Sequence, residues 1–246
     1  MQLKYKTVML TGGASGIGRA TALMLAGEGA RGLLCDVNKE GAEETIGMAK
    51  GGVEFVPLEL TDAASVDACA KEALARAQGK IDVYANVAGW DRTQPFVEAT
   101  PEFIDKVMNI NLLGPLRLTR ALFPAMIAAG GGKIVFVSSD AGRVGSLGET
   151  PYAAAKAGII GLTKSLAREG ARHKINVNCV CPGPTDTPLF HANPERMREA
   201  LLRAIPFRRL ARPEDIAGAV LYFAGPTSDY VTGQVLSVSG GLTMAG

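Results

Sequence analysis

Short runs of Val, Ile and Leu alternate along the chain with longer, Ala-rich stretches in which apolar residues recur at helical spacing. This alternation is typical of βα units, in which each strand is followed by a helix that crosses back over a parallel sheet. It predicts helices over residues 19–27, 63–78, 103–129 and 152–171, and seven strands near residues 7–10, 32–35, 54–58, 81–86, 133–138, 175–181 and 235–238. We therefore expect a single doubly wound α/β domain over residues 1–246, with a seven-stranded parallel sheet flanked by helices.

Two features interrupt the alternation. Pro124 lies late in the third predicted helix and is expected to break it, because proline lacks an N–H and clashes with the preceding turn. The long connection over residues 182–213 is rich in proline and arginine, and such connections often cover a ligand site. We expect residues 188–213 to cover a substrate. A surface excursion without function is the alternative.

Composition and charge exclude several classes of protein. The chain is 47% hydrophobic and 20% charged, which is a globular balance, and its net charge of +2 is too small for a nucleic-acid-binding protein. It has no apolar run of about 18 residues and no signal-peptide core, so we expect neither a membrane span nor export. Four cysteines are too few for a disulfide scaffold and favour the cytoplasm. His173 and His191 lack the spacing of metal ligands, so no metal is expected.

The first predicted strand ends in a glycine-rich turn, TGGASGIGR at residues 11–19, directly before a helical pattern. Glycines at such a turn let the backbone approach a pyrophosphate, whose charge is stabilised by the free N–H groups of the helix. A tight turn alone could also need glycine, but the position in the first βα unit favours a dinucleotide site. The candidate cofactor residues here are Gly12, Ser15, Gly16, Ile17 and Gly18.

Asp36 stands at the end of the second predicted strand, where a carboxylate can accept hydrogen bonds from an adenosine ribose diol. It would repel the 2′-phosphate of NADP, and Ser15 offers no positive charge to attract that phosphate. The sequence therefore favours NAD. A capping role at the start of the segment 39–50 is the alternative reading of Asp36, and both roles are compatible.

Tyr152 and Lys156 are four residues apart and therefore lie on one face of the predicted helix. A phenol is a poor proton acceptor at neutral pH, and a nearby cation stabilises its anion, which favours acid/base work. Ser139 ends the fifth predicted strand, at the edge where doubly wound sheets bind ligands. Ser138 should point the other way along an extended strand, so Ser139 is the candidate that holds a substrate oxygen.

Together these residues resemble the landmarks of the short-chain dehydrogenase/reductase family, in the family's order. The resemblance runs through most of the chain and rests on TGxxxGIG at 11–18, NVAG at 86–89, Asn111, Ser139, Tyr152 with Lys156, and Pro182 with Gly183. It implies a Rossmann-type fold and a catalytic tetrad. In that tetrad Ser139 positions the substrate oxygen and Tyr152 exchanges its proton. Lys156 lowers the tyrosine pKa and binds the nicotinamide ribose, and Asn111 holds a water relay. Val87 replaces the family's usual second Asn.

The same resemblance implies further cofactor contacts and an assembly. It places Asp62 beside the adenine, and it places residues 182–187 around the nicotinamide and pyrophosphate. The family usually forms homotetramers, which we expect here. For Thr187, capping of a helix that begins at Pro188 is an equal alternative. The additional cofactor candidates are Asp62, Asn86, Ala88, Gly89, Pro182, Gly183, Thr185 and Thr187.

The substrate site is expected to combine apolar and basic groups. Aromatic and aliphatic residues indicate a hydrophobic acyl or cyclic moiety; they are Trp90, Val144, Leu147, Leu189 and Phe190. Arginines at 92, 143, 196, 198, 208 and 209 would suit the phosphates of coenzyme A, although pairing with nearby acids is the alternative. The candidate substrate contacts are Trp90, Arg143 and Leu189.

Residues 88–91, 139–145, 181–187 and 232–243 are similar to family members that act on cyclic acyl-CoA thioesters. This resemblance implies NAD-dependent oxidation of a cyclic 3-hydroxyacyl-CoA, such as 2-hydroxycyclohexanecarboxyl-CoA, to its 3-oxoacyl-CoA. A 3-oxoacyl-[acyl-carrier-protein] reductase is one alternative, against which Asp36 argues because biosynthetic reduction commonly uses NADPH. A dehydrogenase of free cyclic alcohols is another. A nucleotide-binding structural or regulatory subunit is a third, and Ser139, Tyr152 and Lys156 argue against it.

Overall fold

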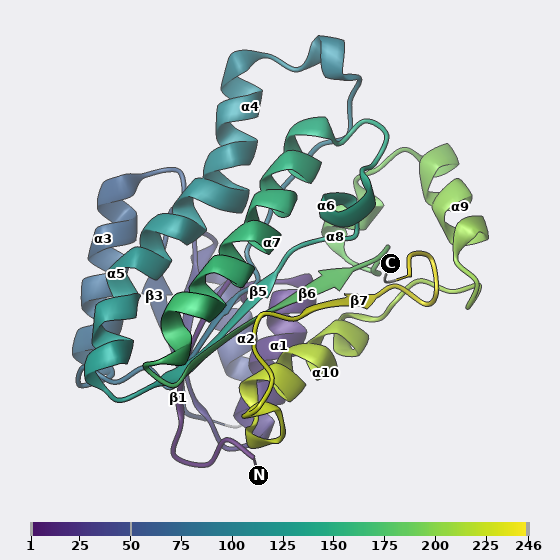
Figure 1. Cartoon of the computed structure of the whole chain (residues 1–246). Coiled ribbons are helices and arrows are strands. Elements are labelled where there is room, and N and C mark those ends of the chain that lie inside the picture. Colours follow the sequence, from purple (N-terminus) through teal and green to yellow (C-terminus); the bar gives the residue numbers. More distant parts are fainter. Residues whose placement is uncertain (1, 50, 245–246) are drawn as a thin grey trace.

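A computed structural model describes residues 2–49 and 51–244 of the chain. Its seven strands form one sheet in which every neighbouring pair is parallel (Figure 1), in the order β3-β2-β1-β4-β5-β6-β7. The strands are β1 (Thr7–Thr11), β2 (Arg31–Asp36), β3 (Val53–Pro57), β4 (Val83–Asn86), β5 (Gly132–Val137), β6 (Ile175–Pro182) and β7 (Val235–Val238). The predicted seven-stranded parallel sheet of a doubly wound, Rossmann-type domain is confirmed.

Helices cover both faces of the sheet. The helices are α1 (Gly16–Gly27), α2 (Lys39–Met48), α3 (Ala63–Arg76), α4 (Pro101–Met108), α5 (Gly114–Ala128), α6 (Ala141–Val144), α7 (Thr150–Ala171), α8 (Pro188–His191), α9 (Glu195–Ala204) and α10 (Pro213–Ala224). Short 3₁₀ turns are η1 (Phe96–Glu98) and η3 (Pro226–Ser228), and a π-helical turn, η2 (Asn109–Leu113), joins α4 to α5. None of the helices in the described residues is long and apolar enough to cross a membrane.

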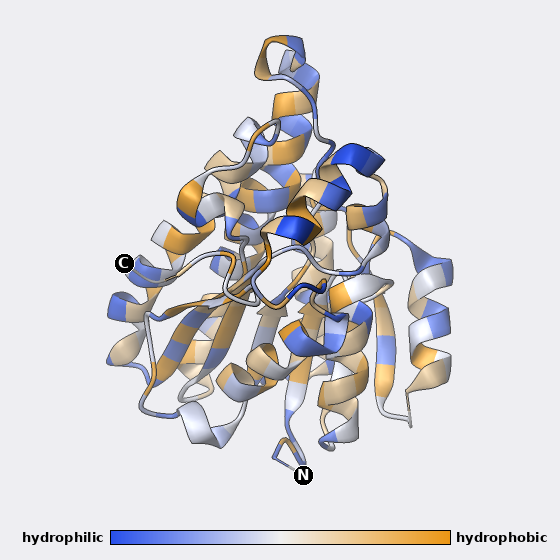
Figure 2. Cartoon of the chain, turned by 90° about the vertical axis from the view of Figure 1, so that its right-hand side faces the viewer, coloured by the Kyte–Doolittle hydropathy of each residue, from blue (hydrophilic) through white to orange (hydrophobic). Residues whose placement is uncertain are grey.

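Successive strand residues feed two separate cores, one on each face of the sheet. Met9 packs with α3, α5 and α7, whereas its neighbours Val8 and Leu10 pack with α1, α2 and α10. Because both faces are covered, the strands are apolar almost throughout rather than alternating in polarity. The surrounding helices show the opposite pattern, with hydrophobic and hydrophilic residues interleaved along each one (Figure 2).

The third predicted helix differs from its expectation. The stretch 103–129 is divided into α4, the π turn and α5, and α5 continues through Pro124 to Ala128, so the expected break at Pro124 is wrong. Proline removes one intrahelical hydrogen bond, but Pro124 lies on the exposed side of α5. On the opposite side, Leu122 and Met126 are buried against the sheet and hold the helix together across the proline.

The strand order places a switch point beside β1. The chain runs outward from β1 through β2 to β3, and then returns to β4 on the other side of β1. Parallel α/β sheets bind ligands at such a point, outside the carboxyl ends of the strands. The glycine-rich turn after β1 and the loops after β4, β5 and β6 all lie at this edge. Residues 188–213, which form α8, α9 and the approach to α10, pack over it (Figure 1).

Candidate active site

Two adjoining cavities lie at the carboxyl edge of the sheet. The first, of about 420 Å³, is lined by the glycine-rich turn after β1 and by Asp36, and we call it the glycine-turn cavity. The second, of about 400 Å³, is lined by Ser139, Tyr152 and Lys156, and we call it the tyrosine cavity. The two share Ile17, Val87, Gly89, Thr187 and Leu189. A ligand that spans both would place one end at the turn and the other at Tyr152.

The glycine-rich turn has no room for side chains where it approaches the sheet. Gly12 has a φ of +78°, and a Cβ there would lie 2.6 Å from the backbone of Ala88. A Cβ at Gly18 would lie 1.8 Å from the carbonyl oxygen of Gly12. Ser15 is the N-cap of α1 but makes no side-chain capping bond, and the first turn holds no acid. The N–H groups of that turn therefore face the cavity as an anion site of the kind that takes a pyrophosphate.

Asp36 lies at the end of β2 and lines the glycine-turn cavity. Its carboxylate accepts hydrogen bonds from the backbone N–H groups of Ala14 and Asn38, each at 2.9 Å. The helix that follows is capped by Asn38, which accepts from Gly41 N at 3.1 Å, so the alternative reading of Asp36 as that cap is wrong. These two hydrogen bonds hold Asp36 between the glycine-rich turn and the start of α2. Each of its oxygens can accept a further hydrogen bond from a ligand in the cavity.

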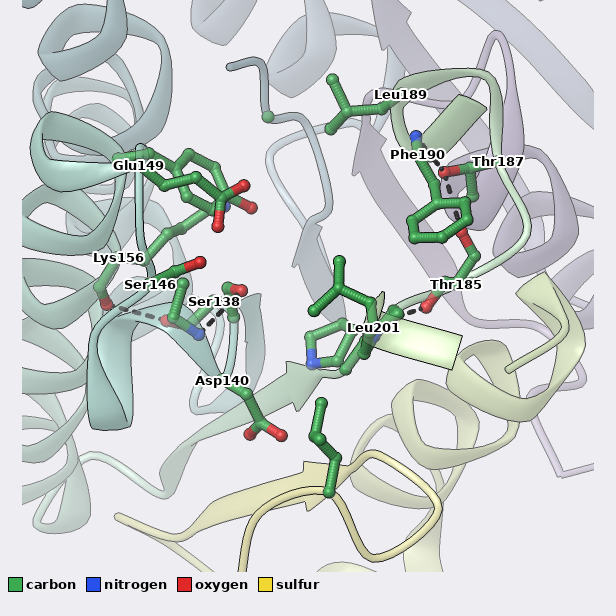
Figure 3. A pocket seen from close by; sticks show the side chains of 18 of the residues that line it. Ser138, Asp140, Ser146, Glu149, Lys156, Thr185, Thr187, Leu189, Phe190 and Leu201 are labelled. Atoms are coloured by element: carbon green, nitrogen blue, oxygen red, sulfur yellow. Dashed lines mark hydrogen bonds between the residues drawn. The ribbon is translucent and has the colours of Figure 1, made fainter. Parts of the chain in front are cut away.

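The tyrosine cavity brings together three of the four predicted catalytic residues, Ser139, Tyr152 and Lys156. Lys156 is buried, donates from Nζ to the carbonyl oxygen of Val137 at 2.9 Å, and lies 5.5 Å from the centre of the Tyr152 ring. The Ser138 hydroxyl donates to the carbonyl oxygen of Lys156 at 2.7 Å (Figure 3). Ser138 therefore anchors α7 while also lining the cavity, and the Ser139 hydroxyl interacts with Tyr152. Since β5 ends at Val137, both serines lie just beyond the strand, and the expectation that Ser139 ends the strand is wrong.

Sequence comparisons show which family has this arrangement of residues. The profile of a family described as enoyl-(acyl carrier protein) reductase matches residues 12–243. A 3-oxoacyl-[acyl-carrier-protein] reductase of Thermotoga maritima is 41% identical over 99% of this chain and all of its own length. The (3R)-3-hydroxyacyl-CoA dehydrogenase of Mus musculus is 35% identical, over 99% of this chain and 98% of its own. The chain belongs to the short-chain dehydrogenase/reductase family.

A third relative within this family acts on a substrate with an aromatic ring. It is the (2S)-[(R)-hydroxy(phenyl)methyl]succinyl-CoA dehydrogenase subunit of Thauera aromatica, 36% identical over 99% of this chain and 99% of its own length. Members of the short-chain dehydrogenase/reductase family are oxidoreductases that use nicotinamide cofactors. The two adjoining cavities fit such a cofactor, because the turn at Gly12 and Gly18 excludes any side chain where a pyrophosphate would lie.

Burial is the main cause of the pKa shifts of Tyr152 and Lys156. It raises the pKa of Tyr152, the charge of Glu149 adds to the rise, and the interaction with Ser139 opposes it. Burial also lowers the pKa of Lys156 to about 8. In the free protein the net shift of the Tyr152 pKa is upward, and the expectation that Lys156 lowers this pKa remains a prediction. The Lys156 ammonium lies beside the Tyr152 ring and donates to the carbonyl oxygen of Val137.

Asn111, the fourth predicted catalytic residue, sits in the π turn between α4 and α5. Its side chain donates to the carbonyl oxygens of Trp90 at 2.7 Å and Val107 at 2.9 Å, and accepts from Trp90 N at 3.2 Å. A Cβ at Gly89 would lie 3.1 Å from Asn111 Oδ1 and 3.2 Å from Lys156 Nζ, so both groups converge there. The water relay remains a prediction. π turns in helices often occur at functional sites.

The other predicted cofactor residues divide into two groups. Most line the cavities, namely Ala88, Gly89, Pro182, Gly183, Thr185 and Thr187. Thr187 also caps α8 by accepting from Phe190 N at 3.3 Å, as its alternative reading predicted. Asp62 and Asn86 lie outside both linings. Asp62 caps α3, and the Asn86 amide oxygen accepts from Thr11 Oγ1 at 3.0 Å within the core.

The three predicted substrate contacts have different surroundings. Leu189 lines both cavities. Trp90 lines the glycine-turn cavity, with the Lys106 ammonium 4.1 Å from its ring centre. Arg143 lies outside both linings, since it is held by Asp140 at 3.1 Å, by Thr243 at 2.7 Å and by the carbonyl oxygen of Met244 at 3.0 Å. Its guanidinium thus anchors the C-terminal segment to the loop after β5.

The sequence interpretation missed several residues of the tyrosine cavity. Glu149 and Ser146 line it from the loop before α7, while Asn193, Met197 and Leu201 line it from the segment over the sheet. Glu149 lies three residues before Tyr152, so its spacing within the helical pattern was a usable signal. The residues on α9 gave no comparable signal. In the described residues, no cluster of three or more His, Cys, Asp or Glu has the geometry of a metal site.

Proposed function

We propose that this protein is an NAD-dependent dehydrogenase that interconverts a 3-hydroxyacyl thioester and its 3-oxoacyl thioester, with a cyclic 3-hydroxyacyl-CoA as the substrate. The observation that carries the reaction type is the meeting of Ser139, Tyr152 and Lys156 in a cavity that adjoins the glycine-rich turn. The thioester is supported by what two of the relatives are named for: 3-oxoacyl-[acyl-carrier-protein] and (3R)-3-hydroxyacyl-CoA.

The residues that would hold the cofactor follow from the two cavities. The first turn of α1 would bind the pyrophosphate, Asp36 the adenosine ribose, and Lys156 the nicotinamide ribose. When bound, the nicotinamide ring accepts or donates the hydride. In the lining of the glycine-turn cavity the acids are Asp36 and Glu59, and Lys106 is the cation, its ammonium directed at the Trp90 ring. This charge balance disfavours a 2′-phosphate and supports NAD.

The protein's own residues would then handle the proton. Ser139 would hydrogen-bond the substrate oxygen, and Tyr152 would take the hydroxyl proton during oxidation or return it during reduction. The raised pKa of Tyr152 favours the neutral phenol, whereas oxidation needs the phenolate as the proton acceptor. The Lys156 ammonium, close to the ring, would stabilise the phenolate that takes up the alcohol proton during oxidation and that forms again when Tyr152 gives up its proton during reduction.

A cyclic acyl group is supported by the apolar part of the tyrosine cavity and by the third relative, which is named for a phenyl-bearing CoA thioester. Val144, Leu189, Phe190 and Leu201 provide that apolar lining (Figure 3 shows the last three). Since Arg143 is held by Asp140, we assign recognition of the CoA phosphates to exposed arginines such as Arg196 on α9.

The test of the proposal is the absorbance of NADH formed from 2-hydroxycyclohexanecarboxyl-CoA, measured beside 3-hydroxybutyryl-CoA, the free cyclic hydroxy acid and an acyl-carrier-protein thioester. Turnover of the cyclic CoA thioester with NAD supports the proposal. Preference for the carrier-protein thioester with NADPH would instead identify a 3-oxoacyl-[acyl-carrier-protein] reductase, the second candidate, which the 41% identity to the Thermotoga maritima enzyme supports. Turnover of the free acid or of simple alcohols alone would remove the thioester from the proposal.

Replacing Asp36 by Asn should shift the cofactor preference toward NADP. The change removes the negative charge at this end of the cavity and keeps one acceptor oxygen, which can retain the hydrogen bond from either Ala14 N or Asn38 N. We expect the ratio of kcat/KM for NAD to that for NADP to fall by about tenfold or more. Glu40→Gln, an exposed acid in the first turn of α2, is the matched control and should leave the ratio unchanged. An unchanged ratio in Asp36→Asn would contradict the assignment.

We also propose a homotetramer, in line with the family resemblance. Leu113 at the end of the π turn, Leu116 on α5 and Leu236 on β7 are large apolar side chains that remain more than a third exposed in the single chain. Such exposed groups on elements at the edge of the fold are suited to contacts between copies. Light scattering of the purified protein would give its mass, and a monomer would contradict this assembly.

A further inference from the structure

A buried carboxylate joins the loop after β5 to the C-terminal end of the chain. Asp140 directly follows Ser139, is only 4% exposed and lines the tyrosine cavity, yet the mechanism above gives it no role. Figure 3 shows its carboxylate directed toward the yellow ribbon of β7. A buried carboxylate costs free energy unless it is paired, so the partners of Asp140 show what its burial achieves.

The partners of Asp140 come from two segments that are far apart in the sequence. Within its own loop, Arg143 pairs with Oδ1 at 3.1 Å. From the end of the chain, the Ser237 hydroxyl donates to both carboxylate oxygens, at 2.9 and 3.0 Å, and the Thr243 hydroxyl donates to Oδ2 at 2.6 Å. Arg143 also donates to Thr243 Oγ1 at 2.7 Å. These four side chains form one hydrogen-bonded group, which we call the Asp140 cluster.

The segment that this cluster holds is part of the wall of the tyrosine cavity. Residues 239–244 follow β7 and form turns, and Leu242 and Thr243 line the cavity. The segment lies beyond the last paired residues of β6 and β7, so the sheet does not fix it. Its Gly240 carbonyl oxygen accepts from Phe207 N at 3.2 Å. The place of Thr243 in the cavity wall depends on side-chain contacts, which the Asp140 cluster supplies.

Different hydrogen bonds hold Ser139 in the same loop. Its hydroxyl accepts from Ala141 N at 3.1 Å. The backbone N–H of Asp140 donates to the carbonyl oxygen of Pro182 at 3.0 Å, which ties the loop to the end of β6. Both bonds use backbone N–H groups and do not involve the Asp140 side chain. Loss of the carboxylate should therefore release the C-terminal segment while Ser139 stays in place.

We infer that Asp140 is a positioning residue that fixes the C-terminal segment, residues 239–244, as a wall of the substrate site. Its carboxylate acts through Ser237 and Thr243 and takes no part in the chemistry. A wall that is held in place before binding spares the complex the free-energy cost of ordering it. The inference rests on the proposed function in one respect, because it takes the tyrosine cavity as the site of the acyl substrate.

Three variants test the role of the carboxylate. Asp140→Ala removes it, whereas Asp140→Asn keeps its shape and one acceptor oxygen. Thr243→Val breaks the contact from the side of the C-terminal segment and leaves the carboxylate paired with Arg143 and Ser237. If Asp140→Ala does not fold, the other two variants decide the question, because both keep the buried site filled.

The control for the loss of a buried acid is Asp82→Ala. The Asp82 side chain is 11% exposed, accepts from Thr7 N at 2.9 Å and from Lys6 Nζ at 3.1 Å, and lies at the opposite edge of the sheet, outside both cavity linings. Its loss should lower the free energy of unfolding and leave the kinetics unchanged. It therefore separates a general loss of stability from the loss of the cavity wall.

The kinetic measurement is the reduction of acetoacetyl-CoA by NADH. In Asp140→Ala and Thr243→Val the KM for the thioester should rise about tenfold, while kcat and the KM for NADH stay within about twofold of wild type. Asp140→Asn should fall between Asp140→Ala and the wild type. The double variant Asp140→Ala/Thr243→Val should be no worse than the weaker single variant, because both changes break the same contact. A wild-type KM in Thr243→Val, or an equal rise in Asp82→Ala, would overturn the inference.

Hydrogen exchange, followed by mass spectrometry on the peptide that contains residues 239–244, tests the anchoring without turnover. This peptide should exchange faster in Asp140→Ala and Thr243→Val than in the wild type and in Asp82→Ala. Exchange at the wild-type rate in both variants overturns the inference. If the wild type reduces no thioester, the proposed function fails, and the exchange result alone then decides whether Asp140 positions the segment.

Discussion

Replacing Tyr152 by Phe should lower kcat/KM by about 10²–10⁴ in both directions of the reaction, which is the usual contribution of a general acid or base. In the proposed mechanism the phenol carries the proton, and Tyr152 lines the same cavity as Ser139. Phenylalanine fills the same space and removes only the hydroxyl, so the fold should be retained. The measurement is steady-state kinetics of NAD reduction and NADH oxidation, together with NADH binding by fluorescence.

The matched control is Tyr222→Phe, which removes the hydroxyl of a tyrosine that is 42% exposed on α10, far from the site in sequence. It should retain wild-type kinetics. NADH binding should survive in Tyr152→Phe, because the glycine-rich turn and Asp36 are untouched. If Tyr152→Phe keeps activity within a few-fold of wild type, the tyrosine does not carry the proton. The nearby carboxyl group of Glu149 would then be the first alternative to examine.

Much of this fold follows from short-range patterns. The strands are read correctly because a parallel sheet covered on both faces needs runs such as residues 7–11 to be apolar throughout. The failure at Pro124 has a tertiary cause. Proline's local preference is against a helix interior, but Leu122 and Met126 are buried against residues distant in sequence, and that packing outweighs one lost hydrogen bond.

The candidate site could be predicted where its chemistry depends on local spacing. Tyr152 and Lys156 are one helical turn apart, and Ser139 follows shortly after β5, at the edge of the sheet where ligands bind. Contacts between distant residues could not be read in this way. Arg143 binds Thr243 and Met244, which lie 100 and 101 positions further along the chain. These contacts hold Arg143 away from the cavities, although its place in the sequence suggested a substrate contact.

The burial of Asp91 is another feature that depends on residues distant in sequence. In the sequence it is one acid in a polar loop, and acids in loops are usually solvated. Its burial depends on how that loop packs at the end of the sheet, where α4 and the segment before α7 also meet. The burial of this acid is therefore a property of the tertiary structure and could not be read from the local sequence.

Lys156→Met should separate activity from stability. Without the ammonium beside the phenol ring, kcat/KM should fall by about a hundredfold or more. The same change should make the protein harder to unfold at neutral pH, because a buried charge is removed and a side chain of similar length fills its space. The lost hydrogen bond to Val137 would offset about 1 kcal/mol of the gain.

The pH dependence of that stability difference tests its cause. Burial lowers the pKa of Lys156 from 10.5 to about 8, so below pH 8 the folded protein carries a cost of up to about 3 kcal/mol for the buried ammonium. Between pH 8 and 10.5 the folded protein loses this proton while the unfolded chain keeps it. The unfolded state then binds more protons, the wild type gains stability as pH rises, and the advantage of Lys156→Met should shrink across this window.

Urea unfolding of both proteins from neutral pH to about pH 10.5 measures this difference, with Lys164→Met, an exposed lysine of α7, as the control. The control should show no such pH-dependent gain. If Lys156→Met is less stable than the wild type throughout, the ammonium is compensated in the fold and Lys156 serves structure as well as chemistry. If instead the gain appears and fades as described, the fold holds a destabilising charge at the one place where Tyr152 needs it.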